Sequence, residues 1–490
     1  MLPGHPILFK SLCYVDGRWE HSDTAESVAV QNPADQKVIG HVPFLTKEQI
    51  TGAVNAAQRA FESWRWVSQR ERSAAVLRWH ELIMRHREDL AALLSQEQGK
   101  PMEESRGEVR YGASFVEWFA HEAQRLGGRT IPTHIDGAHL STHMEPVGVA
   151  ALITPWNFPV AMITRKAAAA IAAGCTVVVK PAHETPYTAL ALAQLAEEAG
   201  FPPGVFNVVL GQPQMAMETL VSDSRVRSVS FTGSTRVGGL VMQAAAHSGI
   251  KKVALELGGN APFIVTEDAD LEKAVQVAVA AKFQTSGQDC CAANRIFVAR
   301  PLYEAFVDKY AAAVRKLKTG PATDAGVDIG PLMHQAALDS TVARVEDARA
   351  KGARILTGGK PHALGGWFYE PTVIADAAPG MRVYDEENFA PISAVCAFDT
   401  LDEVVKKAND TEYGLAAYIC ATRTDVIFQL MRRLDFAMVS VNGVKFTGAP
   451  IPFGGMKASG LGREGGSEGF EPFVETKYLC LGNLGLPLTA

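Results

Sequence analysis

Three polar residues in glycine- and proline-rich segments have the side chains needed for covalent chemistry on a carbonyl group. Cys290 lies in a loop segment, and Glu256 precedes it by a few tens of residues, directly before Leu257-Gly258-Gly259. A cysteine thiolate is a nucleophile, and a nearby carboxylate can accept a proton from the thiol or from water. The carboxamide of Asn157, further upstream, can donate a hydrogen bond to the oxyanion that forms when sulfur adds to a carbonyl.

Each of these residues has an ordinary structural explanation when taken alone. An isolated cysteine is usually a small buried apolar residue, and a glutamate beside two glycines is usually a turn residue. A thiol, a carboxylate and a carboxamide together are less easily explained by chance than each residue alone, so we expect the three residues to share one site.

Composition limits the function classes. A chain of 490 residues, 47% hydrophobic and 20% charged, is globular and long enough for two or three domains. The net charge of −6 and the lack of a basic run argue against a nucleic-acid partner. The most apolar stretch, residues 147–163, is interrupted by Pro155, Asn157 and Pro159, so we expect no membrane segment.

The seven cysteines have no C-x-x-C spacing, which argues against a disulfide framework or a metal site and predicts a reducing, cytoplasmic setting. Cys290 and Cys291 are adjacent, and a disulfide between them would close a strained ring. We expect one of them to be reactive. The other would pack beside it or inhibit it by oxidation.

Hydrophobic periodicity predicts the elements that must position these residues. A capping box at residues 46–49 starts a helix, and a long amphipathic stretch covers 71–95 after a short β start. From residue 147, predicted strands at 147–153, 176–180, 205–210 and 226–231 alternate with predicted helices at 160–173 and 186–199. This βαβαβ pattern predicts a parallel sheet.

A second α/β region is predicted after residue 259. It has helices near 268–281 and 301–317, strands near 394–398 and 438–442, and a possible edge strand at 475–481 that could dock on a partner subunit.

A parallel sheet of this kind binds ligands at the carboxyl ends of its strands. Lys180 closes one predicted strand, and Gly233-Ser234 opens a predicted helix whose N–H groups could face a pyrophosphate. Lys180 could also be a surface lysine, but its place in the sheet favours a ligand contact. Residues 460–465 match G-x-G-x-x-G, yet no strand–helix unit surrounds them, so we do not expect a dinucleotide there.

Seven motifs, taken in order, resemble the aldehyde dehydrogenase superfamily over nearly the whole chain: Trp156-Asn157-Phe158-Pro159, Lys180-Pro181, Phe231-Thr232-Gly233-Ser234-Thr235, Glu256-Leu257-Gly258-Gly259, Gly287-Gln288-Asp289-Cys290, Glu386-Glu387-Asn388-Phe389 and Pro452-Phe453-Gly454-Gly455. Several other stretches, such as Glu97-Gln98-Gly99-Lys100-Pro101, are most similar to the succinate-semialdehyde dehydrogenase branch.

The resemblance implies an α/β fold with three parts. These are a Rossmann-type NAD(P)-binding domain (1–123 and 148–257), an α/β catalytic domain (258–447) and a small β oligomerisation extension (124–147 and 448–490). A homodimer or homotetramer is implied. The implied reaction is the oxidation of an aldehyde to a carboxylic acid through a cysteine thioester, with NADP or NAD as coenzyme.

The resemblance also implies roles for individual residues. Cys290 would be the nucleophile, Glu256 the general base that activates water, and Asn157, with the Cys290 backbone N–H, the oxyanion hole. The implied coenzyme contacts are Thr154, Trp156, Lys180, His183, Gly233, Ser234, Leu257, Glu387 and Phe389.

Two departures from the family pattern bear on specificity. Many NAD-selective relatives have a glutamate three positions after the strand-end lysine, where this chain has His183, so we predict that NADP is used, alone or beside NAD. The expected substrate contacts are Phe158, Arg165, Gln284, Lys445 and Thr447. Because Gln284 stands where the succinate-semialdehyde branch has a second arginine, half of the carboxylate clamp is missing.

The predicted substrate is therefore a semialdehyde such as succinate semialdehyde, and the alternative is an uncharged aliphatic or aromatic aldehyde. A CoA-acylating enzyme would generally lack Glu256, and a non-catalytic relative would have no reason to keep Cys290, Glu256 and Asn157 together.

Overall fold

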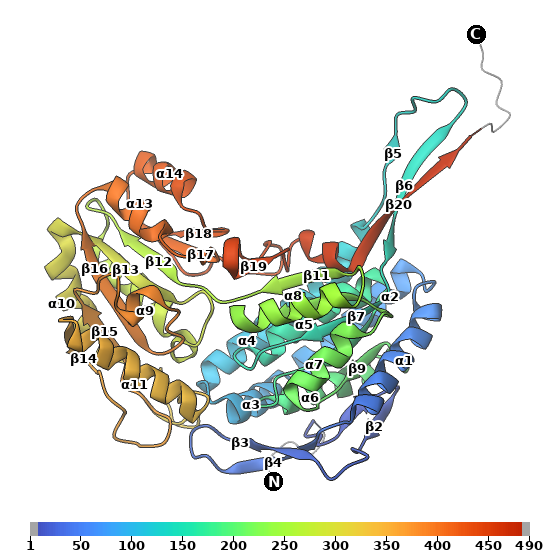
Figure 1. The fold of residues 1–490 in the computed structure, drawn as a ribbon, viewed down its shortest axis with the longest axis horizontal. Coiled ribbons are helices and arrows are strands. Elements are labelled where there is room, and N and C mark those ends of the chain that lie inside the picture. Colours follow the sequence, from blue (N-terminus) through green and yellow to red (C-terminus); the bar gives the residue numbers. More distant parts are fainter. Residues whose placement is uncertain (1–7, 483–490) are drawn as a thin grey trace.

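The computed structural model describes residues 8–482, which form two large sheets, each flanked by helices (Figure 1). The first sheet has eight strands in the order β19-β11-β10-β7-β8-β9-β1-β2. Its bounds are β1 Cys13–Val15, β2 Arg18–Glu20, β7 Val149–Ile153, β8 Thr176–Lys180, β9 Phe206–Val208, β10 Val226–Thr232, β11 Lys252–Glu256 and β19 Gly460–Leu461.

The five inner strands of this sheet, β7 to β11, are parallel. Numbered along the chain, they lie in the order 5-4-1-2-3, which is the doubly wound arrangement with its switch point between β7 and β10. Ligands bind such sheets in the crevice beyond the carboxyl ends of the two strands at the switch point. The fold therefore predicts that the loops that follow Ile153 and Thr232 bind a ligand.

Eight helices belong to the first part of the chain: α1 Lys47–Trp64, α2 Gln69–Arg85, α3 Arg87–Gln98, α4 Met102–Glu122, α5 Pro159–Ala173, α6 Pro186–Glu198, α7 Pro213–Ser222 and α8 Thr235–His247. Helix α5 is buried along its whole length. Its alanine-rich sequence permits close packing, Pro159 occupies the first turn, and Gly174 ends the helix with a φ of 105°. Pro159 therefore sets the point at which the loop after β7 ends and α5 begins.

The second sheet has seven strands in the order β14-β15-β16-β13-β12-β17-β18. Its bounds are β12 Ala261–Val265, β13 Ala293–Ala299, β14 Arg354–Thr357, β15 Thr372–Ala375, β16 Ile392–Phe398, β17 Ala416–Cys420 and β18 Met438–Val441. The helices of this region are α9 Leu271–Phe283, α10 Tyr303–Val314, α11 Gln335–Ala350, α12 Arg382–Asp385, α13 Leu401–Asn409 and α14 Thr424–Arg433. Separate clusters of buried apolar side chains pack against its two faces.

Two smaller sheets complete the described fold. Strand β20 (Val474–Leu481) pairs antiparallel with β6 (His139–Pro146), which also pairs with β5 (Thr130–Ile131). This three-stranded sheet projects away from the body of the molecule (Figure 1). The other small sheet joins β3 (Ser27–Gln31) and β4 (Val38–Pro43) near the amino terminus.

Most predicted elements are present within a few residues of their predicted bounds, and the capping box at Thr46 and Gln49 is confirmed. The amphipathic stretch at 71–95 is not one helix, because His86 leaves helical geometry (φ −98°, ψ 20°) between α2 and α3. No proline or glycine marks this break, so periodicity alone does not predict it. Among the described residues, no helix has the length and apolar character that a membrane crossing requires.

Candidate active site

The loop after β7 carries Asn157 to the junction of the two large sheets. Only 4% of Asn157 is exposed, and its Nδ2 donates to the Gln288 carbonyl at 3.1 Å. Its Oδ1 has no hydrogen-bond partner. One N–H of the carboxamide is thus held by the segment before Cys290, and the other is free to meet a reacting oxygen.

Glu256 ends β11, and neither of its carboxylate oxygens has a hydrogen-bond partner, although only 2% of the residue is exposed. Burial raises the pKa of Glu256 to about 7, against the opposing effect of the Arg165 guanidinium. Gly259 is required by a close backbone approach, because a Cβ there would lie 2.4 Å from the Cys290 carbonyl. A Cβ at Gly258 would lie 2.6 Å from the Glu387 carboxylate and would displace that side chain.

Cys290 follows an unusual turn in which Thr285 and Ser286 have φ of 49° and 57°. The Glu104 carboxylate holds this turn by accepting from the Thr285 N–H at 2.9 Å. Cys290 is half-buried, whereas Cys291 is buried, and all seven cysteines are free thiols. A hydrogen bond with Cys291, loss of solvent and the facing Glu256 carboxylate raise the pKa of the Cys290 thiol well above its ordinary value. The thiol therefore needs a proton acceptor to become a nucleophile.

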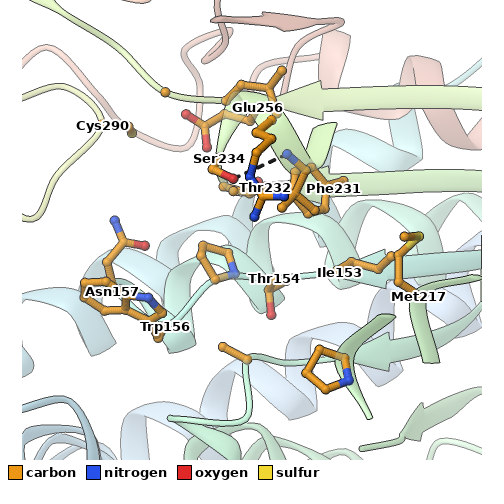
Figure 2. Close-up of a pocket in the computed structure, with 18 of the residues that line it drawn as sticks. Ile153, Thr154, Trp156, Asn157, Met217, Phe231, Thr232, Ser234, Glu256 and Cys290 are labelled. Atoms are coloured by element: carbon orange, nitrogen blue, oxygen red, sulfur yellow. Dashed lines mark hydrogen bonds between the residues drawn. The ribbon is translucent and has the colours of Figure 1, made fainter. Parts of the chain in front are cut away.

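Two cavities meet at Cys290. The larger one, about 600 Å³, runs past Asn157 and Glu256 to the carboxyl ends of β7, β8 and β10. The second, about 430 Å³, approaches Cys290 from the side of α4, α5 and the loop after β18. Figure 2 shows the Glu256 carboxylate and the Asn157 carboxamide facing the space beside Cys290. A substrate carbonyl at this junction would lie within reach of all three side chains.

The larger cavity has the features of a dinucleotide site. Its walls include Lys180 at the end of β8, apolar side chains and Ser234, which caps α8. The hydroxyl groups of Thr154 and Thr232 are buried without partners, as expected for polar atoms that await a ligand. All nine residues expected to contact coenzyme line this cavity: Thr154, Trp156, Lys180, His183, Gly233, Ser234, Leu257, Glu387 and Phe389.

One detail of the phosphate prediction changes. The Gly233 N–H donates to the Glu256 carbonyl at 3.0 Å, so it is not available to a pyrophosphate. The Ser234 hydroxyl accepts from the Val237 N–H and keeps its own proton free to donate. Sequence reasoning missed Arg236, an exposed cation in the same first turn of α8 that also lines the larger cavity.

The second cavity contains all five expected substrate contacts: Phe158, Arg165, Gln284, Lys445 and Thr447. Arg165 is already engaged, because its Nε lies 2.5 Å from the Glu464 carboxylate and its guanidinium lies 4.3 Å from the centre of the Phe453 ring. Lys445 is exposed. The cavity thus presents one partly neutralised cation, one free amide at Gln284 and one solvent-facing cation.

Sequence reasoning also missed a buried charge network beside Glu256. Lys166 donates to Glu464 and, at 3.0 Å, to the Ser230 hydroxyl. Glu464 lies within the G-x-G-x-x-G match at residues 460–465. Within that match, strand β19 pairs with β11 beside Glu256, so these glycines carry a carboxylate into the site rather than bind a dinucleotide.

The side chains of Asp289, Cys290 and Cys291 place their ligand atoms within 4.8 Å of one another. Asp289 is occupied structurally, since its Oδ1 accepts from the Cys291 N–H at 2.8 Å. The prediction that the chain uses no metal stays a prediction.

Comparison with known proteins gives the family. The model of the aldehyde dehydrogenase family matches residues 19–479. The aspartate-semialdehyde dehydrogenase (non-phosphorylating) of Halomonas elongata is 54% identical over 98% of this chain and 97% of that protein. The NADP succinate-semialdehyde dehydrogenase GabD of Escherichia coli is 46% identical over 97% and 98%. The crystal structure of succinate-semialdehyde dehydrogenase from Burkholderia pseudomallei superimposes with a TM-score of 0.97, at 46% identity, over 98% of this chain and 99% of that one.

The chain therefore belongs to the aldehyde dehydrogenase family, and its predicted fold class is confirmed. It is an enzyme that oxidises an aldehyde with NAD or NADP.

Proposed function

We propose that Cys290 is the nucleophile of this aldehyde dehydrogenase, with Glu256 as general base and Asn157 in the oxyanion hole. The observation that carries the proposal is that Cys290 lines both cavities, so that its sulfur can meet an aldehyde from one side and a nicotinamide from the other. Beside it, the Glu256 carboxylate has no hydrogen-bond partner and supplies a proton acceptor, and the second N–H of the Asn157 carboxamide supplies a donor to oxygen.

The proposed reaction begins when the Cys290 thiol releases its proton to solvent and the sulfur attacks the aldehyde carbon. The carbonyl oxygen gains negative charge as a tetrahedral adduct forms, and the Asn157 amide stabilises it. The bound coenzyme supplies a hydride acceptor, so that loss of hydride leaves a thioester on Cys290. Glu256 then takes a proton from water as the water oxygen attacks the thioester, and it returns this proton to the Cys290 sulfur as the carboxylic acid is released.

For the substrate we propose a short semialdehyde with a carboxylate at its far end. Arg165 and Lys445 are the cations of the second cavity, and the Gln284 and Thr447 side chains add neutral hydrogen-bond donors. Relatives at 46–54% identity are named for succinate and aspartate semialdehydes. An uncharged aldehyde is the second candidate, because Arg165 is paired with Glu464 and Gln284 replaces the expected second arginine.

For the coenzyme we propose a preference for NADP. His183 follows Lys180 where a glutamate would repel a 2′-phosphate, and Arg236 adds a cation to the same cavity. Glu184 opposes this preference, but its carboxylate lies 3.4 Å from the His183 Nδ1. The named activity of the Escherichia coli relative supports NADP as well.

We also propose the domain division stated above, with 1–123 and 148–257 binding coenzyme and 258–447 carrying the nucleophile. The projecting β5-β6-β20 sheet supports a homodimer or homotetramer joined through 124–147 and 448–490, and the seven free thiols fit a cytoplasmic setting.

Paired variants of the adjacent cysteines test the central assignment. Cys290→Ala should abolish formation of NADPH from succinate semialdehyde and NADP, in both the pre-steady-state burst and the steady state. Cys291→Ala, the matched control, removes a thiol of the same loop and should keep most of both. Equal losses in the two variants would refute the assignment of the nucleophile.

A further inference from the structure

A buried ion pair that takes no part in the proposed chemistry contacts the backbone of the loop that carries Asn157. Lys100 and Glu108 are 2% and 3% exposed, and the Lys100 Nζ lies 2.6 Å from the Glu108 Oε2. Lys100 precedes α4, and Glu108 lies on its second turn. A buried ion pair generally gives little net stability compared with apolar residues of the same size. The role of this pair is therefore indicated by the groups to which it hydrogen-bonds.

The pair bonds to both ends of the segment that carries Asn157. The Lys100 Nζ donates to the Asn157 carbonyl at 2.7 Å and lies 4.0 Å from the centre of the Phe158 ring. The other Glu108 oxygen accepts from the N–H groups of Val160 and Ala161 at 2.9 and 3.3 Å, in the first turn of α5. The backbone before and after Phe158 is thus held by one charge pair.

These bonds leave the functional end of Asn157 free. Its backbone carbonyl is occupied by Lys100, while its Oδ1 has no partner and its Nδ2 has one hydrogen directed at Gln288. Charge-assisted hydrogen bonds are about twice as strong as neutral ones, and water cannot replace them at a buried position. An amide that must meet an oxyanion needs such fixed placement, because small displacements of an oxyanion-hole donor weaken the hydrogen bond that lowers the barrier.

We propose that Lys100 and Glu108 are positioning residues for the oxyanion hole, which act on the reaction through the placement of Asn157. Lys100 lines neither cavity, whereas Glu108 also lines the second one. The inference rests on the proposed role of Asn157. It predicts that loss of Lys100 or Glu108 lowers kcat while the KM for NADP and the reactivity of the Cys290 sulfur stay the same.

A double-mutant cycle in the full-length enzyme tests this coupling. Asn157→Ala should lower kcat by about 100- to 1,000-fold, as removal of one oxyanion donor does. Lys100→Met should lower kcat by about 10- to 100-fold, and the double variant should fall within about twofold of Asn157→Ala, the scatter expected when no second effect adds. If Lys100→Met is insoluble, Glu108→Gln replaces it in the same cycle, and the KM for the aldehyde is measured as well because Glu108 also lines the second cavity.

Alkylation of Cys290 by iodoacetamide separates positioning from general damage, because this reaction forms no oxyanion. The alkylation rate of the Lys100→Met variant should equal that of the wild-type enzyme. Glu97→Gln is the matched structural control, since this buried carboxylate caps α6 through the Tyr187 and Thr188 N–H groups and lines neither cavity. It should lower the melting temperature and leave kcat unchanged.

The outcomes distinguish the two levels of the proposal. If Asn157→Ala retains full kcat, the proposed oxyanion hole is wrong. If Asn157→Ala is impaired but the losses multiply in the double variant, or if Lys100→Met slows alkylation as much as turnover, only the positioning role of Lys100 and Glu108 is refuted.

Discussion

The pKa of Glu256 makes a quantitative prediction about turnover. The carboxylate must be deprotonated to activate water, and burial raises its pKa to about 7. A raised pKa means that the active base form is lost as the pH falls through 7. About one tenth of Glu256 is in this form at pH 6 and about one hundredth at pH 5, so kcat should fall about tenfold for each pH unit below 7.

The assay is stopped-flow formation of NADPH between pH 5 and pH 9 with saturating succinate semialdehyde. Because thioester hydrolysis becomes rate-limiting at low pH, a burst equal to the enzyme concentration should appear below pH 7 while kcat falls. Glu464→Gln should move the fall in kcat about one pH unit lower, a change of about 1.4 kcal/mol, since Arg165 and Lys166 would then act on Glu256 without an opposing anion. A kcat that stays level from pH 5.5 to pH 8 would refute the reasoning.

Two further predictions concern specificity. His183→Glu places a carboxylate where a 2′-phosphate is expected, so kcat/KM for NADP should fall by at least about tenfold while the value for NAD changes little; equal changes for both coenzymes would contradict the role of His183. Gln284→Arg restores a second guanidinium to the substrate cavity, so kcat/KM should rise by about tenfold for succinate semialdehyde and not for propanal; a matching rise for propanal would show that Gln284 does not contact the carboxylate.

The sequence predicts the architecture well where local rules and tertiary packing agree. Pro159 at the start of α5 and Gly174 at its end are local signals, and the buried helix follows them. The parallel strands could be predicted because short apolar runs alternate with helices. The break at His86 could not, since nothing in its local sequence opposes a continuous helix.

The sequence motifs in loops predict the reactive and ligand-contacting side chains of the site. All predicted coenzyme and substrate contacts line one of the two cavities. The charge partners were not predictable, because the segments of Lys166 and Glu464 lie almost 300 residues apart and meet only through packing of α5 against the β19 region. The same holds for Lys100, whose contact with the Asn157 carbonyl depends on the approach of α4 to α5.

The most direct test of the proposed mechanism is to trap the thioester. Glu256→Gln removes the proton acceptor for hydrolysis and should lower kcat by about 100- to 10,000-fold. Acid quenching of this variant after mixing with succinate semialdehyde and NADP, followed by peptide mass spectrometry, should find one acyl group on Cys290 for each NADPH formed. An acyl group on Cys291, or NADPH formed without any acylated cysteine, would contradict the account.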